Sequence, residues 1–215
     1  MDKIKSIIFD FDGTLHDTMK IYQPAFESGV DLLKENGYAK DFTPFASNIE
    51  KFLGEKPDFA YKQIAKDAPR ELIEKAMKKV GTGMEDNMET VGELYPGTTE
   101  VLENLYKNYD LYILSNCRIR YLEKALDVYG IRKYFKDYFT GEAFNYIPKE
   151  DILKNERKNI KEGIIFVGDR YHDIRAAVDN DIPAVFASYG FGPAEEGKDA
   201  DYKIDSIKEL LKIIK

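Results

Sequence analysis

Residues 4–17 read Ile-Lys-Ser-Ile-Ile-Phe-Asp-Phe-Asp-Gly-Thr-Leu-His-Asp, an apolar run that ends in acidic residues. The apolar part, Ser6–Phe9, has no polar alternation, which is typical of a strand buried on both faces of a sheet. In an extended chain residues two apart face the same way, so Asp10 and Asp12 project together while Phe11 turns into the packing. This stretch predicts a buried strand with two carboxylates at its carboxyl end.

The acidic pair has two interpretations. Neighbouring carboxylates repel each other and are costly to desolvate, so they normally need a metal ion or a shared proton. Gly13 permits a tight turn whose backbone N–H groups can hold phosphate oxygens. The alternative is a solvated acidic loop, and the pair taken alone favours neither. The rest of the chain decides between them.

From residue 93 onward, short apolar runs alternate with amphipathic segments. The expected strands are residues 111–114, 138–140, 164–167, 184–186 and 202–204. The expected helices are residues 98–108 and 119–129, with shorter ones near 149, 173 and 206. This alternation implies right-handed crossovers and a parallel sheet covered on both faces. The expected fold class is α/β, a doubly wound parallel sheet.

Residues 18–92 do not alternate in this way. Apolar residues recur at helical spacing, and Pro57 and Pro69 stand where first helical turns begin. Several glycines indicate a flexible return near the end of the region: Gly81, Gly83 and Gly92. We expect a small helical cap domain of residues 18–92, inserted into a catalytic core of residues 1–17 and 93–215. Such an insertion overhangs the carboxyl end of the first strand, where open α/β sheets bind ligands.

The composition limits the partners of the chain. Its 215 residues are 43% hydrophobic and 33% charged, with a net charge of −7, which argues against nucleic acid or an anionic membrane surface. Cys117 is the only cysteine, so no internal disulfide can form. No apolar stretch approaches the length of a membrane span. We expect a cytoplasmic protein.

Polar residues follow the later strands at their carboxyl ends. Ser115 and Asn116 end the first of them, where a hydroxyl and amides can hold a phosphate oxygen, although a plain turn has the same composition. Asp169 ends another strand and could complete an oxygen site for a hard cation. Asp173 lies at a helix start, where it could also be an N-cap. Lys149 also begins a helix, where a cation is unfavourable unless it holds an anion or faces solvent.

These residues together resemble the haloacid dehalogenase-like hydrolase superfamily, in its phosphoglycolate-phosphatase-like branch with a helical type-one cap. The resemblance covers essentially the whole chain. It rests on four motifs and a late turn, in chain order Asp10-Phe11-Asp12-Gly13-Thr14-Leu15, Ser115-Asn116, Lys149, Gly168-Asp169 with Asp173, and Tyr189-Gly190-Phe191-Gly192.

The resemblance implies a magnesium-dependent phosphatase for a small-molecule phosphate ester, working through an aspartyl phosphate. Asp10 would be the nucleophile, and Asp12 would protonate the leaving group and then activate water. The Mg²⁺ ligands would be the Asp10 side chain, the Asp12 backbone carbonyl and Asp169, with Asp173 orienting Lys149 or a water. Phosphate binding is assigned to Gly13, Thr14, Ser115, Asn116 and Lys149. Dehalogenase members lack an acid at the position of Asp12, because halide needs no proton.

Some positions carry weaker predictions. The third motif could instead use Lys154 or Lys158. Asp181 stands where relatives usually have glycine, and aspartate tolerates left-handed geometry moderately well. The histidines His16 and His172 flank the site in sequence, and we expect local hydrogen bonding from them. In the cap, substrate specificity is assigned weakly to Lys51, Gly54 and Lys56, which also suit a charged helix end.

Two other functions compete with the phosphatase. A β-phosphoglucomutase-like sugar phosphomutase uses the same aspartyl phosphate but needs a second phosphate-binding site in the cap, which usually includes arginine. Arg70 lies well away from the expected cap loop, so hydrolysis is favoured. A non-catalytic phosphate-binding module predicts the loss of a motif residue, and none is missing. The family includes both monomers and homodimers, so either state is expected.

Overall fold

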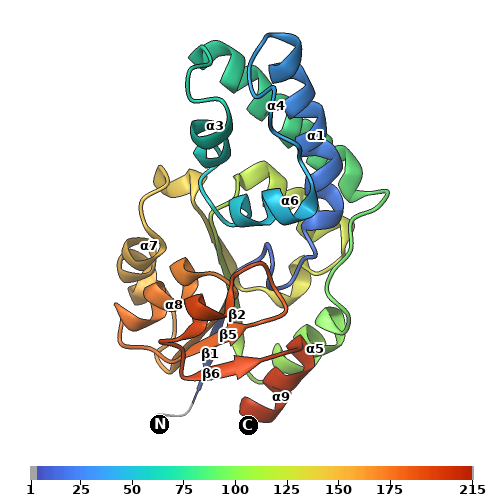
Figure 1. The fold of residues 1–215 in the computed structure, drawn as a ribbon. Helices are drawn as coiled ribbons and strands as arrows, with labels where there is room; N and C mark the ends of the chain where they lie inside the picture. The colour runs from blue at the N-terminus through green and yellow to red at the C-terminus, as the bar shows by residue number, and fades with distance from the viewer. Residues whose placement is uncertain (1–3, 215) are drawn as a thin grey trace. The chain divides into compact units, whose positions relative to one another are not determined.

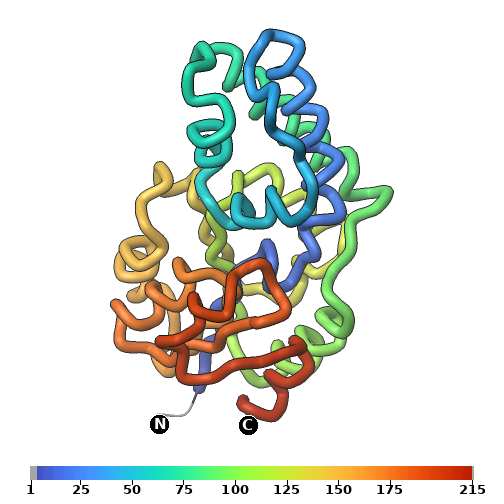
Figure 2. The backbone as a smooth tube through the Cα atoms, viewed as in Figure 1, coloured from blue at the N-terminus to red at the C-terminus, as the bar shows by residue number. Residues whose placement is uncertain are grey.

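The computed structural model describes residues 4–214. The chain divides into two compact units, Met1–Asp17 with Leu94–Lys215 and, between these segments, Thr18–Glu93. Figure 2 traces the chain from the first segment into the helical unit and back. Within residues 4–214, no helix is both long enough and apolar enough to cross a membrane.

The larger unit is built on a parallel sheet. Within residues 4–214 it has six strands, ordered β3-β2-β1-β4-β5-β6. Every neighbouring pair is parallel. The strands are β1 (Ser6–Phe9), β2 (Asp110–Ser115), β3 (Asp137–Thr140), β4 (Ile164–Gly168), β5 (Ala184–Ala187) and β6 (Tyr202–Ile204). All expected strands are therefore confirmed, to within one residue at each end.

Helices cover both faces of this sheet. They are α5 (Thr98–Leu105), α6 (Ile119–Val128), α7 (Lys149–Glu156), α8 (Tyr171–Val178) and α9 (Leu210–Ile213). The chain moves from β1 to β2 and β3 in one direction, and from β4 to β5 and β6 in the other. Right-handed crossovers therefore put α7 and α8 on one face and α5 on the other. The packing agrees, because α7 contacts α8 and α5 contacts α9 (Figure 1). The predicted doubly wound α/β fold is confirmed.

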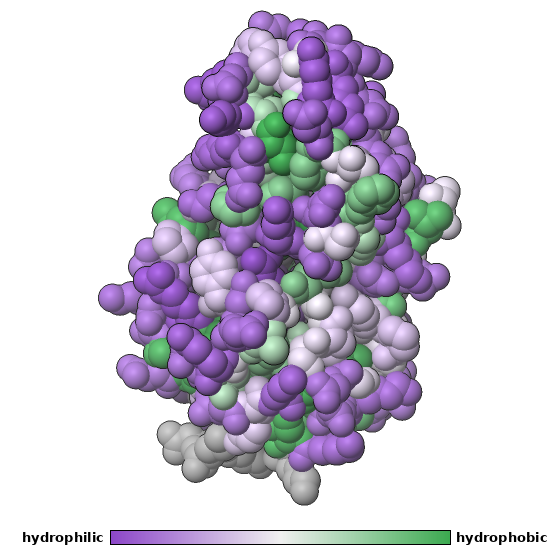
Figure 3. Space-filling model, viewed as in Figure 1, coloured by the Kyte–Doolittle hydropathy of each residue, from purple (hydrophilic) through white to green (hydrophobic). Residues whose placement is uncertain are grey.

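The sheet is buried because its strands are apolar on both faces. All four residues of β1 are buried, as are all those of β4 and β5. Side chains from β1, β2 and β4 pack with α7 and α8 in one cluster, which includes Ile8, Tyr112 and Phe166. Charged and polar side chains cover most of the surface seen in Figure 3. Burial of this kind determines where each strand ends, and therefore where the residues that follow it lie.

The second unit is a helical bundle. Its elements are α1 (Met19–Glu35), α2 (Ala46–Ile49), the short 3₁₀ turn η1 (Glu50–Phe52), α3 (Phe59–Ile64) and α4 (Arg70–Met88). The prediction that Gly81 and Gly83 form a flexible return is wrong, because both lie inside α4. A Cβ on Gly83 would come within 3.1 Å of the Ala25 Cβ on α1, and one on Gly29 within 2.4 Å of Val80. These glycines allow close packing of α1 on α4.

The turn that follows α8 contains a residue in a strained backbone conformation, Asp181. It follows α8 with a φ of 53°, so the expected left-handed geometry is confirmed. A non-glycine residue pays a steric penalty there. We predict that Asp181→Gly raises the free energy of unfolding by about 0.5–1 kcal/mol in urea denaturation. Asp179→Gly is the control, because Asp179 has a φ of −69° and should lose stability when replaced. A less stable Asp181→Gly protein would contradict the strain.

Candidate active site

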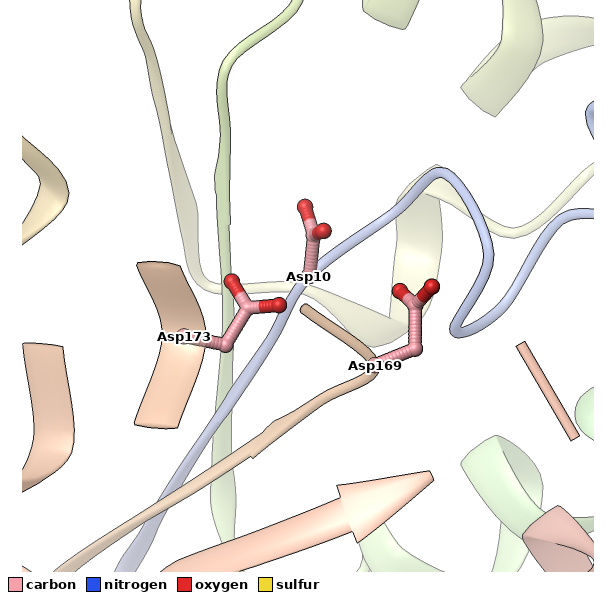
Figure 4. Close-up of side chains that lie close together, drawn as sticks. All are labelled: Asp10, Asp169 and Asp173. Carbon is pink, nitrogen blue, oxygen red and sulfur yellow. The ribbon is translucent and has the colours of Figure 1, made fainter. Parts of the chain in front are cut away.

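The site lies at the topological switch point of the sheet. Strands β1 and β4 are neighbours, with Phe9 opposite Val167, and the chain leaves them toward opposite edges. Asp10 follows β1 and Asp169 follows β4, so both stand at carboxyl ends, where ligands of open α/β sheets bind. Figure 4 shows these two carboxylates with that of Asp173 from α8. One carboxylate oxygen from each residue lies within 4.8 Å of the others.

A single buried ammonium joins two of these acids. Lys149 begins α7, and its Nζ lies 2.9 Å from Asp10 Oδ1 and 2.6 Å from Asp173 Oδ1. Burial lowers the pKa of Lys149, but the charges of Asp10 and Asp173 outweigh burial and raise it above its usual value. The ammonium therefore stays charged. Lys154 and Lys158 are exposed, so the structure places Lys149, and neither alternative, beside Asp10.

Asp173 is held by two donors. It occupies the third position of α8, where Oδ2 accepts a hydrogen bond from the Arg170 N–H at 3.0 Å and Oδ1 accepts one from Lys149. Its carboxylate therefore caps the helix and also positions the ammonium. A Cβ at Gly168 would come within 2.2 Å of the Asp173 Cβ, so only glycine fits at this strand end.

Asp169 accepts two hydrogen bonds and packs against two glycines. Its Oδ1 accepts a hydrogen bond from the Thr14 hydroxyl at 3.0 Å, and its Oδ2 accepts one from the Phe191 N–H at 2.8 Å. A Cβ on Gly13 or on Gly190 would approach the Asp169 side chain to 2.3 Å. Burial and the charge of Asp173 raise the pKa of Asp169 to about 7. Thr14 thus directs its hydroxyl to Asp169, and its predicted contact with phosphate stays a prediction.

Ser115 ends β2, the strand next to β1, and is 2% exposed. Its carbonyl accepts a hydrogen bond from the Gly141 N–H at 2.8 Å. Asn116 follows it and is partly exposed. Burial raises the pKa of the Cys117 thiol, which disfavours a reactive thiolate. The structure therefore brings Ser115 and Asn116 to the edge of the sheet that carries Asp10, and their phosphate contacts stay predictions.

Asp12 has neighbours that the sequence did not identify. Its Oδ1 accepts a hydrogen bond from the Tyr121 hydroxyl on α6, and the ring of His16 lies between Asp12 and Tyr129. Burial, and then the negative charge of Asp12, raise the pKa of Tyr121 well above its usual value. The expected local hydrogen bonding of His16 is confirmed by its contact with Asp12, four residues away, whereas its contact with Tyr129 joins distant parts of the chain. No motif predicted the two tyrosines, because helical spacing alone gives them a core role.

The charge of this cluster is unbalanced. Asp10, Asp169 and Asp173 carry three negative charges when ionised, and Lys149 returns one, which leaves −2. Burial raises the pKa of Asp10 well above its usual value, Asp173 raises it further, and Lys149 lowers it. Oxygen ligands with this excess charge fit a hard divalent cation.

The cap candidates lie in the helical unit. Lys51 lines a surface pocket of 450 Å³ with seven other residues, Ala39, Lys40, Asp41, Phe42, Phe52, Gln63 and Ile64. Its ammonium sits 5.2 Å from the centre of the Phe52 ring. Gly54 adopts a φ of 78°, which suits a turn, and Lys56 is exposed. Substrate specificity at Lys51, Gly54 and Lys56 stays a prediction.

Comparisons with known proteins bear on the family and the fold of the chain. The family model of haloacid dehalogenase-like hydrolases matches residues 7–187. A phosphoglycolate phosphatase of Vibrio parahaemolyticus is 26% identical over 98% of this chain and 96% of its own length. A predicted phosphoglycolate phosphatase of Haemophilus somnus has a similar fold, with a TM-score of 0.85 and 24% identity over 100% of both chains. A magnesium-bound hydrolase of Bacillus subtilis has a TM-score of 0.69 and 18% identity over 99% of both chains.

Asp169 gives a test of the charge imbalance. Its raised pKa means that the folded protein resists ionising it, so the metal-free protein should lose stability as the pH rises from about 4 to about 7. We predict that Asp169→Asn raises the free energy of unfolding at pH 8 by about 2 kcal/mol in chelator. The amide can keep both contacts, since the Thr14 hydroxyl can turn to accept. Urea denaturation at pH 5 and pH 8 measures the effect, and a destabilised variant at pH 8 would contradict it.

Proposed function

The chain belongs to the haloacid dehalogenase-like hydrolase family, and we propose that it is a magnesium-dependent phosphatase of small-molecule phosphate monoesters. The observation that carries the proposal is the buried group of Asp10, Lys149, Asp169 and Asp173 at the carboxyl ends of β1 and β4. Its excess negative charge calls for a cation, and its ammonium suits an anionic substrate. A phosphoryl group beside a metal ion supplies both.

The metal assignment follows from the oxygen donors. Asp10 and Asp169 would hold Mg²⁺ through their side chains, together with the Asp12 backbone carbonyl. Asp173 is assigned to positioning Lys149, because one of its oxygens already accepts from Lys149 and the other from the Arg170 N–H. When bound, Mg²⁺ would screen the charge between Asp10 and the phosphoryl oxygens.

The reaction would proceed in two displacements. An oxygen of Asp10 bonds to phosphorus while the ester P–O bond breaks, and the departing oxygen takes a proton from Asp12. Asp12, now ionised, removes a proton from water, whose oxygen attacks the phosphorus of the aspartyl phosphate. The Asp10–phosphorus bond breaks, which releases inorganic phosphate and restores both residues. The Asp10 Oδ1 already lies 2.9 Å from Lys149 and accepts the Phe11 N–H at 2.7 Å, so this oxygen is fixed.

The substrate class is proposed from the relatives. Phosphoglycolate phosphatases from Vibrio parahaemolyticus and Mannheimia succiniciproducens match this chain over nearly its whole length, at 26% and 24% identity. Phosphoglycolate is a small phosphate monoester of a hydroxy acid. Monoesters of that size are therefore the first compounds to test. The helical unit is the proposed cap, because insertions at this place can close over a substrate and select it.

We expect the purified protein to release phosphate from a panel of monoesters only when Mg²⁺ is present. Asp10→Asn should lower kcat by a factor on the order of 10⁴, because the variant has no carboxylate nucleophile. Asp137→Asn is a matched control, since Asp137 is exposed and also accepts the N–H of its next residue, at 2.8 Å. It should retain wild-type activity.

Phosphate release in the presence of a chelator at the same rate as with Mg²⁺ would overturn the metal dependence. Full activity of Asp10→Asn would overturn the nucleophile and leave the phosphatase class standing. Isomerisation of a sugar phosphate with little phosphate release would identify a phosphomutase instead.

A further inference from the structure

The Asp12 carboxylate accepts a hydrogen bond from α6 at Oδ1. The Tyr121 hydroxyl donates to Oδ1 at 2.7 Å, and His16 Nδ1 lies 3.5 Å from the same oxygen. The side chain of Asp12 is 14% exposed, whereas that of His16 is fully buried. Tyr121 and His16 therefore contact the carboxylate from the protein interior, while part of the Asp12 side chain remains exposed at the surface of the site.

The protons on this cluster can be assigned by counting donors. A tyrosine hydroxyl has one proton, and Tyr121 gives its proton to Asp12. At the other contact of Tyr121, 3.3 Å away, His16 Nδ1 must therefore carry the hydrogen. His16 Nε2 lies 2.8 Å from the Tyr129 hydroxyl, which donates to it in the Nδ1–H tautomer. The donors run in one direction, from Tyr129 through His16 and Tyr121 to Asp12.

The rings of this network are fixed by packing. His16 stacks on Phe11 with ring centres 5.2 Å apart and 18° between planes, and Phe11 meets Tyr121 edge to face at 6.3 Å. Phe11 and His16 are fully buried, and Tyr121 is 6% exposed. Phe11 stands between Asp10 and Asp12 in the chain, so the packing that buries it also places both acids. Hydrogen bonds in such an enclosed site hold their geometry strongly.

We propose that Tyr121 is a positioning residue, held by His16 and Tyr129, that fixes the Asp12 carboxyl for proton transfer to the leaving oxygen. Because Oδ1 accepts the bond from Tyr121, a proton on this carboxyl is placed on Oδ2. Tyr121 does not touch the reacting atoms and acts through Asp12. This role rests on the proposed function of Asp12.

The chemistry of the leaving group separates positioning from general structural support. An alkoxide needs a proton as it departs, whereas p-nitrophenolate is a stable anion and leaves without one. The ratio kcat/KM reports the steps up to this departure, so it excludes the later hydrolysis of the aspartyl phosphate. Loss of positioning should therefore lower kcat/KM for an alkyl ester far more than for p-nitrophenyl phosphate.

The experiment uses the full chain with Mg²⁺, p-nitrophenyl phosphate and the best alkyl monoester of the substrate panel. We expect Tyr121→Phe to lower kcat/KM about 10–100-fold for the alkyl ester and less than about 3-fold for the aryl ester. Tyr129→Phe should give the same pattern with a smaller loss, and it replaces Tyr121→Phe as the test if that variant does not fold. Tyr138→Phe is the matched control, since it removes a hydroxyl bonded to the Glu123 carboxylate at 2.7 Å. It should leave both ratios unchanged.

Equal losses on the two esters, or no loss on either, would overturn the positioning role of Tyr121. Asp12→Asn is measured in parallel. It should lower kcat/KM for the alkyl ester selectively, by a larger factor than Tyr121→Phe does. If Asp12→Asn does so while Tyr121→Phe does not, only the positioning role is wrong. If Asp12→Asn hydrolyses the alkyl ester at the wild-type rate, the proposed acid–base role of Asp12 is wrong, and with it the role of Tyr121.

Discussion

The site depends on negative charge held in a buried place. Asp10, Asp169 and Asp173 are each at most 1% exposed, and one ammonium, that of Lys149, contacts two of them, Asp10 and Asp173. Burying carboxylates is costly unless cations or N–H donors compensate them. Lys149 and the N–H groups of Arg170 and Phe191 provide part of that compensation. A metal ion and its substrate would supply the remainder, so the excess negative charge of the cluster and its proposed chemistry have the same origin.

The parallel sheet makes this arrangement possible. Apolar strands stop where their burial stops, and polar residues then follow at one edge. Because β1 and β4 are neighbours, Asp10 and Asp169 meet without any long-range signal in the sequence. This part of the site could be predicted from the strand patterns and from the order of motifs. The lysine of the third motif could be placed only approximately, because three lysines, Lys149, Lys154 and Lys158, lie near the start of this helix. The structure distinguishes them, since Lys149 alone of the three is buried.

Other contacts could not be predicted, because they join residues that lie far apart in the chain. Gly190 belongs to a recognisable turn, yet only the fold shows that a side chain there would collide with Asp169. Gly83 looks like a loop residue until α1 is found packed against α4. Tyr121 and Tyr129 fit a helix that faces the core, and their hydroxyls gain a role only from the position of His16. Sequence patterns predict which face of a helix or strand is buried. Contacts between residues far apart in the chain depend on how these elements pack, which the patterns do not give.

The central claim is that Asp10 carries the phosphoryl group during turnover, and mass spectrometry of rapidly quenched protein tests it most directly. The account predicts a phosphoryl adduct on the peptide that contains Asp10, formed when substrate and Mg²⁺ are mixed with the enzyme. The adduct should accumulate in Asp12→Asn assayed with p-nitrophenyl phosphate, because aryl departure needs no acid whereas hydrolysis of the intermediate needs the base. Steady release of phosphate with the adduct on another residue, or with none on Asp10 in either protein, would contradict it.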